Sequence, residues 1–162
     1  MLEILGNLGD FLGGIGVLVT LIYLAIQIRQ NTKSNCAASY QEATAALSDW
    51  SSNLARDSNS MRIFITGANE LEKLDGLERA QFRLLIMSLF RHFENLHFQY
   101  LQGTMDDDTW AGWKQRIIGT LGGAGTAEFW ETQKGVFSPK FQEFIDSSNL
   151  EEGTRFLEDR IT

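Results

Sequence analysis

The first third of the chain contains an unbroken apolar run, and the rest alternates apolar and polar positions at helical spacing. Residues Phe11–Ile28 carry no formal charge, whereas Asp10 precedes them and Arg29 and Lys33 follow. At about 1.5 Å per residue these helical residues span about 27 Å, close to the thickness of a membrane's hydrocarbon core. The pattern therefore predicts one transmembrane helix over residues 11–28.

Two alternatives for this run are a buried helix of a soluble core and a cleaved signal peptide. Between Val17 and Ile26 only Thr20 and Tyr23 carry polar groups, so no face of this helix suits water. A signal peptide begins with basic residues and ends at small residues before its cleavage site. The residues before Phe11 carry only acidic charges, and no such site precedes Arg29. We therefore expect a membrane helix that is not cleaved.

The charges beside the run predict its orientation. Lys and Arg close to a span stay on the cytoplasmic side of the membrane, so Arg29 and Lys33 place the following domain in the cytoplasm. The predicted division of the chain is a short extracytoplasmic tail (residues 1–10), the transmembrane helix (11–28), a cytoplasmic helical domain (29–149) and a C-terminal tail or short helix (150–162).

Small and polar residues recur along one side of the predicted membrane helix. They follow steps of three and four, a period of about 3.5 residues that is typical of paired helices. In lipid, small residues let two backbones approach closely, and polar ones can bond across the contact. Thr20 and Gln27 are expected to supply such bonds. We predict that this side of the helix, called the glycine seam below, forms a helix–helix interface with a second copy or with another membrane subunit. The glycine seam consists of Gly6, Gly9, Gly13, Gly16, Thr20, Tyr23 and Gln27.

The chain after Lys33 is predicted to form a soluble helical bundle, which makes the whole protein all-α. One apolar face is formed by Cys36, Tyr40, Ala43, Leu47, Trp50 and Leu54, and a second by Phe82, Ile86, Leu89, Phe93, Leu96 and Tyr100. Ser58–Ser60 predicts a turn, and Gly67 the end of a short helix. Further helix starts are predicted at Asp75 with Glu78 (a capping box), at Asp106, at Thr126 and at Ser138-Pro139.

The composition limits the kinds of partner and the cellular compartment that we expect for this protein. The formal net charge is −7, and the acidic excess falls after Lys33. An acidic domain argues against nucleic acid as a partner and leaves membrane lipid and protein subunits. Cys36 is the only cysteine, so no disulfide can form within the chain, in agreement with a reducing cytoplasm.

Three features invite a chemical interpretation. Glu94 and His97 have the E-x-x-H spacing of di-iron bundles, but such a site needs a second histidine motif, so a partly buried histidine is the simpler expectation. The glycine-rich stretch Gly119–Gly125 lacks the Lys-Ser/Thr of a phosphate loop and is expected to be a flexible connector. The many aromatic residues are expected to form core, and the alternative is that some of them form a groove for a partner or a hydrophobic ligand. We predict no metal, cofactor or catalytic residue.

Two parts of the chain together resemble a widespread group of small, uncharacterised bacterial membrane proteins. Members join a segment like L-x-Y-L-A-x-Q-I-R-Q-N-T to an acidic helical domain that ends in a motif like F-W-E…F-S-P-x-F. The matching residues are Leu21–Thr32, Phe129–Glu131 and Phe137–Phe141. The resemblance implies a single-pass protein of the bacterial inner membrane with a cytoplasmic helical domain, and it implies no activity.

These observations lead to one expected function and two alternatives. The first is a non-enzymatic membrane protein that assembles through its glycine seam, as a homo-oligomer, and presents a helical interaction domain to the cytoplasm. The second is an accessory subunit of a larger membrane complex, such as a respiratory or photosynthetic assembly. The third is an enzyme or small-ligand binder located in the aromatic domain.

Overall fold

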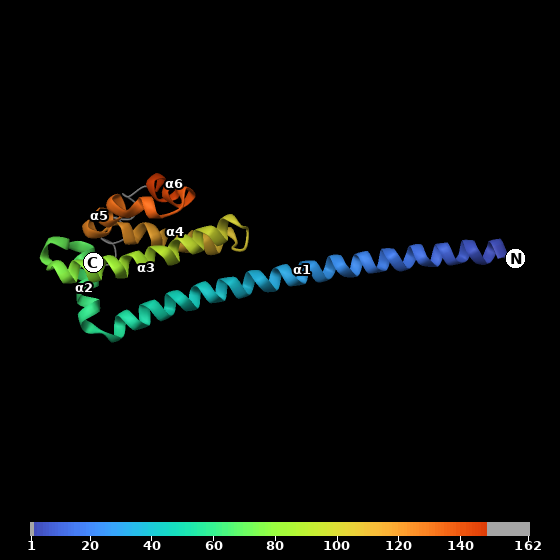
Figure 1. Cartoon of the computed structure of the whole chain (residues 1–162), viewed down its shortest axis with the longest axis horizontal. Helices are drawn as coiled ribbons and strands as arrows, with labels where there is room; N and C mark the ends of the chain where they lie inside the picture. Colours follow the sequence, from blue (N-terminus) through green and yellow to red (C-terminus); the bar gives the residue numbers. More distant parts are fainter. Residues whose placement is uncertain (1, 149–162) are drawn as a thin grey trace. The chain divides into compact units, whose positions relative to one another are not determined.

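A computed structural model of the chain describes the backbone of residues 2–148 and the side chains of residues 13–148. The described part is helical and contains no strand, and one long apolar N-terminal helix is followed by a helical domain, so the predicted fold class is confirmed. The predicted tail 150–162 lies outside the described residues. The helices are α1 (Leu2–Arg56), α2 (Ser58–Asn69), η1 (Leu71–Lys73), α3 (Gly76–Leu101), α4 (Asp107–Leu121), α5 (Ala124–Gln133), η2 (Lys134–Val136) and α6 (Pro139–Ser147) (Figure 1).

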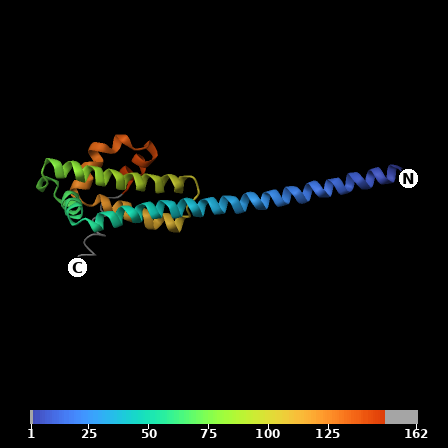
Figure 2. The same cartoon turned by 60° about the horizontal axis from the view of Figure 1, so that its bottom comes forward.

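The chain divides into two units, residues 1–38 and residues 39–162. Helix α1 belongs to both, and it is an uninterrupted helix (Figure 2). Its continuity follows from the sequence, because no Gly or Pro occurs between Val17 and the end of α1 at Arg56.

In the second unit, the last part of α1 packs through the face that the sequence predicts. Ala43, Leu47 and Leu54 are buried, and Tyr40 and Trp50 pack against the core. Cys36, which begins the predicted face, is only partly buried. The helical period of apolar residues therefore identifies the packed face of α1 within this unit.

Helix α3 is the central helix of the domain core. Phe82, Ile86, Phe90 and Phe93 are fully buried along it, and Leu96 continues the same face. At about 25 cal/mol per Å², each such side chain contributes about 1.5–3 kcal/mol when it leaves water. Around α3 lie the buried aromatic and aliphatic residues of the neighbouring helices: Ile63, Trp110, Ile117, Leu121, Phe129, Trp130, Phe137, Phe141 and Ile145.

Two of the predicted helix starts are confirmed in detail. The Asp75 carboxylate accepts a hydrogen bond from the Glu78 N–H at 2.9 Å, and the Glu78 carboxylate accepts one from the Asp75 N–H at 3.2 Å, which completes the capping box. The Asp106 carboxylate accepts a hydrogen bond from the Thr109 N–H at 2.8 Å. Helix α3 ends before Gly103, whose φ of +70° is a left-handed conformation that favours glycine.

Three other local predictions are wrong. Ser58–Ser60 is the first turn of α2, because the Asp57 carboxylate caps the helix through the Asn59 N–H. Helix α2 does not end at Gly67 but continues to Asn69. Thr126 does not cap α5: its hydroxyl donates to the carbonyl oxygens of Thr120 and Gly123, each at 2.7 Å, and the N-cap is Gly123.

The glycine-rich stretch after α4 is a tight packing joint, where the sequence suggested a flexible connector. A Cβ atom added to Gly125 would lie 1.8 Å from the carbonyl oxygen of Gly67, and one added to Gly123 would lie 2.3 Å from that of Ala68. Both distances are far shorter than any van der Waals contact. The glycines are therefore required because the backbones of α2 and α5 approach each other directly.

Candidate functional site

The apolar segment of α1 is exposed along its whole described length. Every large apolar side chain from Ile15 to Ile28 is between 43 and 66% exposed. Helix α1 is long and apolar enough to cross a membrane, and its most apolar stretch is not buried in the structure. A soluble protein rarely leaves a continuous apolar surface of this size in water, so the segment needs lipid or protein around it.

The described part of the predicted glycine seam has open space around its glycines. A Cβ atom added to Gly13 or to Gly16 would meet no atom within 4 Å. The Thr20 hydroxyl donates to the Gly16 carbonyl at 2.8 Å, and the Gln27 amide donates to the Tyr23 hydroxyl at 2.6 Å. These donors are therefore engaged within α1, whereas the sequence suggested bonds to a second helix. The backbone of Gly6 and Gly9 belongs to α1, and their surroundings lie outside the described side chains.

The two basic residues at the end of this segment remain exposed. Arg29 and Lys33 are on α1, and neither forms an ion pair within the described part of the chain. Their charges are available to interact with the polar surface of a membrane.

Glu94 and His97, the E-x-x-H pair, both form contacts inside the domain. His97 is buried and its ring stacks on Phe144, with ring centroids 4.8 Å apart, and it also contacts the rings of Trp110 and Phe141. Burial disfavours the imidazolium and lowers the pKa of His97. No group of three or more potential metal-ligating side chains occurs among residues 13–148.

Glu94 fastens the start of α6 to α3. Its carboxylate accepts a hydrogen bond from the Ser138 N–H at 2.7 Å and forms an ion pair with Arg91 at 2.7 Å. Partial burial opposes ionisation, but these hydrogen bonds outweigh it and lower the pKa of Glu94. Arg91 also donates to the Val136 carbonyl at 3.1 Å, and its guanidinium lies 4.6 Å from the centre of the Phe137 ring.

The aromatic motif near the C-terminus, residues Phe129–Glu131 and Phe137–Phe141, is likewise part of the core. Trp130 stacks on Phe90 at 5.6 Å between ring centroids and contacts Phe137 and Phe141, and its indole N–H donates to Asp146 at 2.8 Å. The motif therefore closes the domain by joining α5 and α6 to α3. Its aromatic residues are used in packing, as the sequence predicts for most of the aromatic residues.

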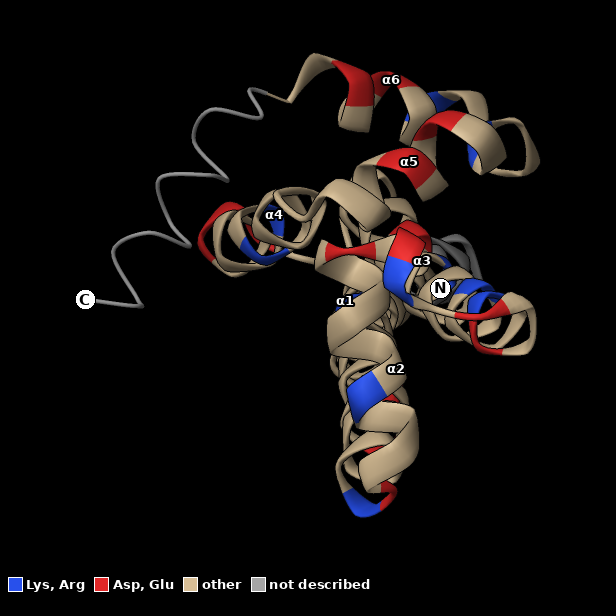
Figure 3. Ribbon diagram, turned by 90° about the vertical axis from the view of Figure 1, so that its left-hand side faces the viewer, with Lys and Arg blue, Asp and Glu red and all other residues tan. Residues whose placement is uncertain are grey.

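Charges are mixed over the domain. Helices α4 and α6 each carry both acidic and basic residues, and on α4 the acidic ones are in the first turn (Figure 3). An ion pair joins Arg62 to Glu78, and Lys134 pairs with Glu131 at 3.1 Å.

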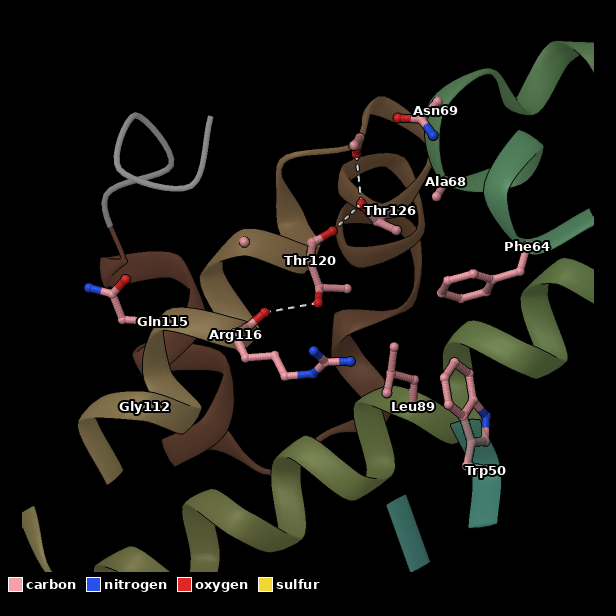
Figure 4. Close-up of a pocket in the computed structure, with 12 residues that line it drawn as sticks. Trp50, Phe64, Ala68, Asn69, Leu89, Gly112, Gln115, Arg116, Thr120 and Thr126 are labelled. Atoms are coloured by element: carbon pink, nitrogen blue, oxygen red, sulfur yellow. Dashed lines mark hydrogen bonds between the residues drawn. The ribbon is translucent and has the colours of Figure 1, made fainter. Parts of the chain in front are cut away.

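Among the cavities of the domain, one of about 370 Å³ opens between α1, α2, α3, α4 and α5. Trp50, Phe64 and Leu89 form its apolar side, and Gln115 and Arg116 of α4 lie at its polar side (Figure 4). The sequence gives no sign of this cavity, because its walls come from five helices that are far apart along the chain.

Comparison of the chain with protein-family models, with curated proteins and with solved structures finds no match. The functional argument therefore rests on the residues and their geometry: an exposed apolar helix segment joined to a helical domain with an aromatic core.

Proposed function

We propose that the protein is a non-enzymatic, single-pass protein of the bacterial inner membrane, which assembles through the glycine seam of α1 and presents its helical domain to the cytoplasm. The observation that carries the proposal is the exposed apolar surface from Ile15 to Ile28. Lipid would cover most of this surface, and the seam would be covered by a second copy of the same helix.

The open space at Gly13 and Gly16 supports the assembly step. Glycine removes the side chain that would hold two helix axes apart, so dispersion contacts between backbones become possible. Because Thr20 and Gln27 donate within their own helix, we expect close packing rather than cross-helix hydrogen bonds to supply most of the association energy.

The proposed non-enzymatic role is supported by the use of the chain's histidine motif in packing. His97 stacks in the core, and Glu94 is occupied by Ser138 and Arg91. Neither side chain is presented to a substrate in the described domain.

The decisive experiment is native mass spectrometry of the full chain in nanodiscs, after gentle extraction from its own membrane. The proposal predicts a single mass that is an integer multiple, greater than one, of the 18.3 kDa chain. Gly16→Leu should shift the protein to the monomer, because leucine fills the space that the partner backbone needs. Gly14→Leu is the matched control: it lies off the seam, its added Cβ also meets open space, and it should leave the assembly unchanged.

Two other results would contradict the proposal in different ways. A mass that requires other polypeptides would identify an accessory subunit of a larger membrane complex. An unchanged assembly in both glycine variants would show that the seam is not the contact.

Orientation can be tested through Cys36, the only cysteine. A thiol reagent that cannot cross membranes should leave Cys36 unlabelled in intact cells with a permeabilised outer membrane, and should label it after the inner membrane is disrupted. Labelling in the first condition would place the domain on the opposite side.

A further inference from the structure

The cavity lined by Trp50, Phe64, Leu89 and Arg116 combines an apolar wall with one positive charge that has no ion-pair partner among residues 13–148. We propose that it is a binding site for a small organic anion with an aromatic body, such as an aromatic carboxylate. This inference is independent of the membrane assembly proposed above.

The apolar wall is built by three side chains. Trp50 and Phe64 contact each other edge to face, with ring centroids 5.4 Å apart and an interplanar angle of 76°, and Leu89 is buried beside them. Aromatic pairs of this geometry hold their rings in fixed positions. The wall therefore offers a flat or compact apolar ligand a preformed surface.

The polar side presents one positive charge. Figure 4 shows the Arg116 side chain extending from α4 toward Leu89 and the aromatic wall. Arg116 is the only charged residue that lines the cavity, and it forms no ion pair among residues 13–148. In a chain with a net charge of −7, a cavity whose lining has a cation and no carboxylate favours an anion. The fork of a guanidinium matches the two oxygens of a carboxylate.

The hydroxyl groups on this side do not compete for the ligand. The Thr120 hydroxyl donates to the Arg116 carbonyl at 2.9 Å, and the Thr126 hydroxyl donates to carbonyl oxygens of the chain. The guanidinium of Arg116 is consequently the charged donor on this side that remains for a bound anion, whereas Figure 4 shows the Gln115 amide pointing away from Arg116 and the aromatic wall.

The size and rigidity of the cavity limit the ligand. A volume of about 370 Å³ is near the lower end of small-molecule sites, which favours a ligand of one or two rings over a long-chain lipid. Gly123 lines the cavity at the tight joint with Ala68. The backbone contact that fixes α5 against α2 therefore lies beside the cavity.

The test is isothermal titration calorimetry of the full chain in nanodiscs with 2-naphthoate, with empty nanodiscs as the blank and 2-naphthamide as the uncharged analogue. We expect saturable binding of one naphthoate per chain and at least about tenfold weaker binding of the amide, since a hydrogen bond to a charged group is worth that factor or more. Arg116→Gln should weaken naphthoate binding by a similar factor without affecting folding, because Arg116 is exposed.

A cavity-filling variant provides a second, independent measurement. Gly112 lines the cavity within α4, and a Cβ added there meets no atom within 4 Å, so Gly112→Leu should block the site while α4 keeps its structure. Gly135→Leu, at a glycine with equal space outside the cavity, should bind like the wild type. Equal binding of acid and amide, unchanged binding by Gly112→Leu, or no saturable heat above the blank would each overturn the proposal.

Discussion

The joint between α2 and α5 predicts a large difference between two glycine substitutions in the same domain. Gly125→Ala places a Cβ atom 1.8 Å from the Gly67 carbonyl oxygen. The obstructing atom belongs to the backbone, so no side-chain rotation can relieve the clash. The two helices must instead move apart at the point where they are closest.

The size of the effect follows from packing. Overpacking a well-packed core costs about 1–3 kcal/mol and occasionally more, and a clash with a fixed backbone oxygen belongs at the upper end, at about 3 kcal/mol. For a domain of this size, that cost corresponds to a fall in Tm of about 10–20 °C. Helix propensity acts in the opposite direction, since Ala is favoured over Gly by up to about 1 kcal/mol in a helix interior.

Gly112→Ala is the matched control, because Gly112 is inside α4 and its added Cβ meets no atom within 4 Å. This variant should be stabilised by up to about 1 kcal/mol. The assay is thermal or urea unfolding of the full chain in mild detergent, followed by tryptophan fluorescence, since all four tryptophans follow residue 49 and report on the helical domain. If Gly125→Ala unfolds at the wild-type temperature, the close approach of α2 and α5 is not a feature of the folded protein.

Two further predictions concern ionisable groups. Burial lowers the pKa of His97 below its ordinary 6.5, so the unfolded chain binds a proton more readily and the domain should lose stability as the pH falls from about 7 to about 5. His97→Phe keeps the stack on Phe144 and should remove most of that loss in unfolding measured at several pH values. An unchanged dependence of stability on pH would show that His97 is not its source. Hydrogen bonds lower the pKa of Glu94 below 4.5, so the contribution of its carboxylate to folding stability should be present above that pH and lost as the pH falls further. Glu94→Gln should lower the free energy of unfolding by about 1–3 kcal/mol near neutral pH, measured by urea unfolding. The exposed Glu143→Gln should stay within about 0.5 kcal/mol of the wild type, and an equal effect of both variants would argue against a specific bond between Glu94 and Ser138.

The amino-acid sequence by itself determined the helical class, the packed faces of α3 and of the last part of α1, and the helix caps at Asp75 and Asp106. Phe82, Ile86 and Phe93 are buried because a period of 3.6 residues places them on one face, and any partner that covers this face buries all three. Asp75 and Asp106 cap their helices through residues three positions away, so the information is contained within a few residues of sequence. The exposed apolar segment of α1 follows from composition in the same way.

Only the tertiary structure decided what the special residues of the domain do. From the sequence, Gly125 is predicted to belong to a flexible connector, whereas in the structure it packs against the backbone of α2. Glu94 resembles half of a metal motif in the sequence, whereas in the structure it accepts a hydrogen bond from Ser138, 44 residues later. The cavity beside Arg116 likewise requires five helices to converge. The physical reason is that periodicity and capping depend on residues a few positions apart, whereas a close backbone approach, a long-range hydrogen bond or a cavity depends on which distant segments pack together. No local pattern in a single sequence specifies those tertiary contacts.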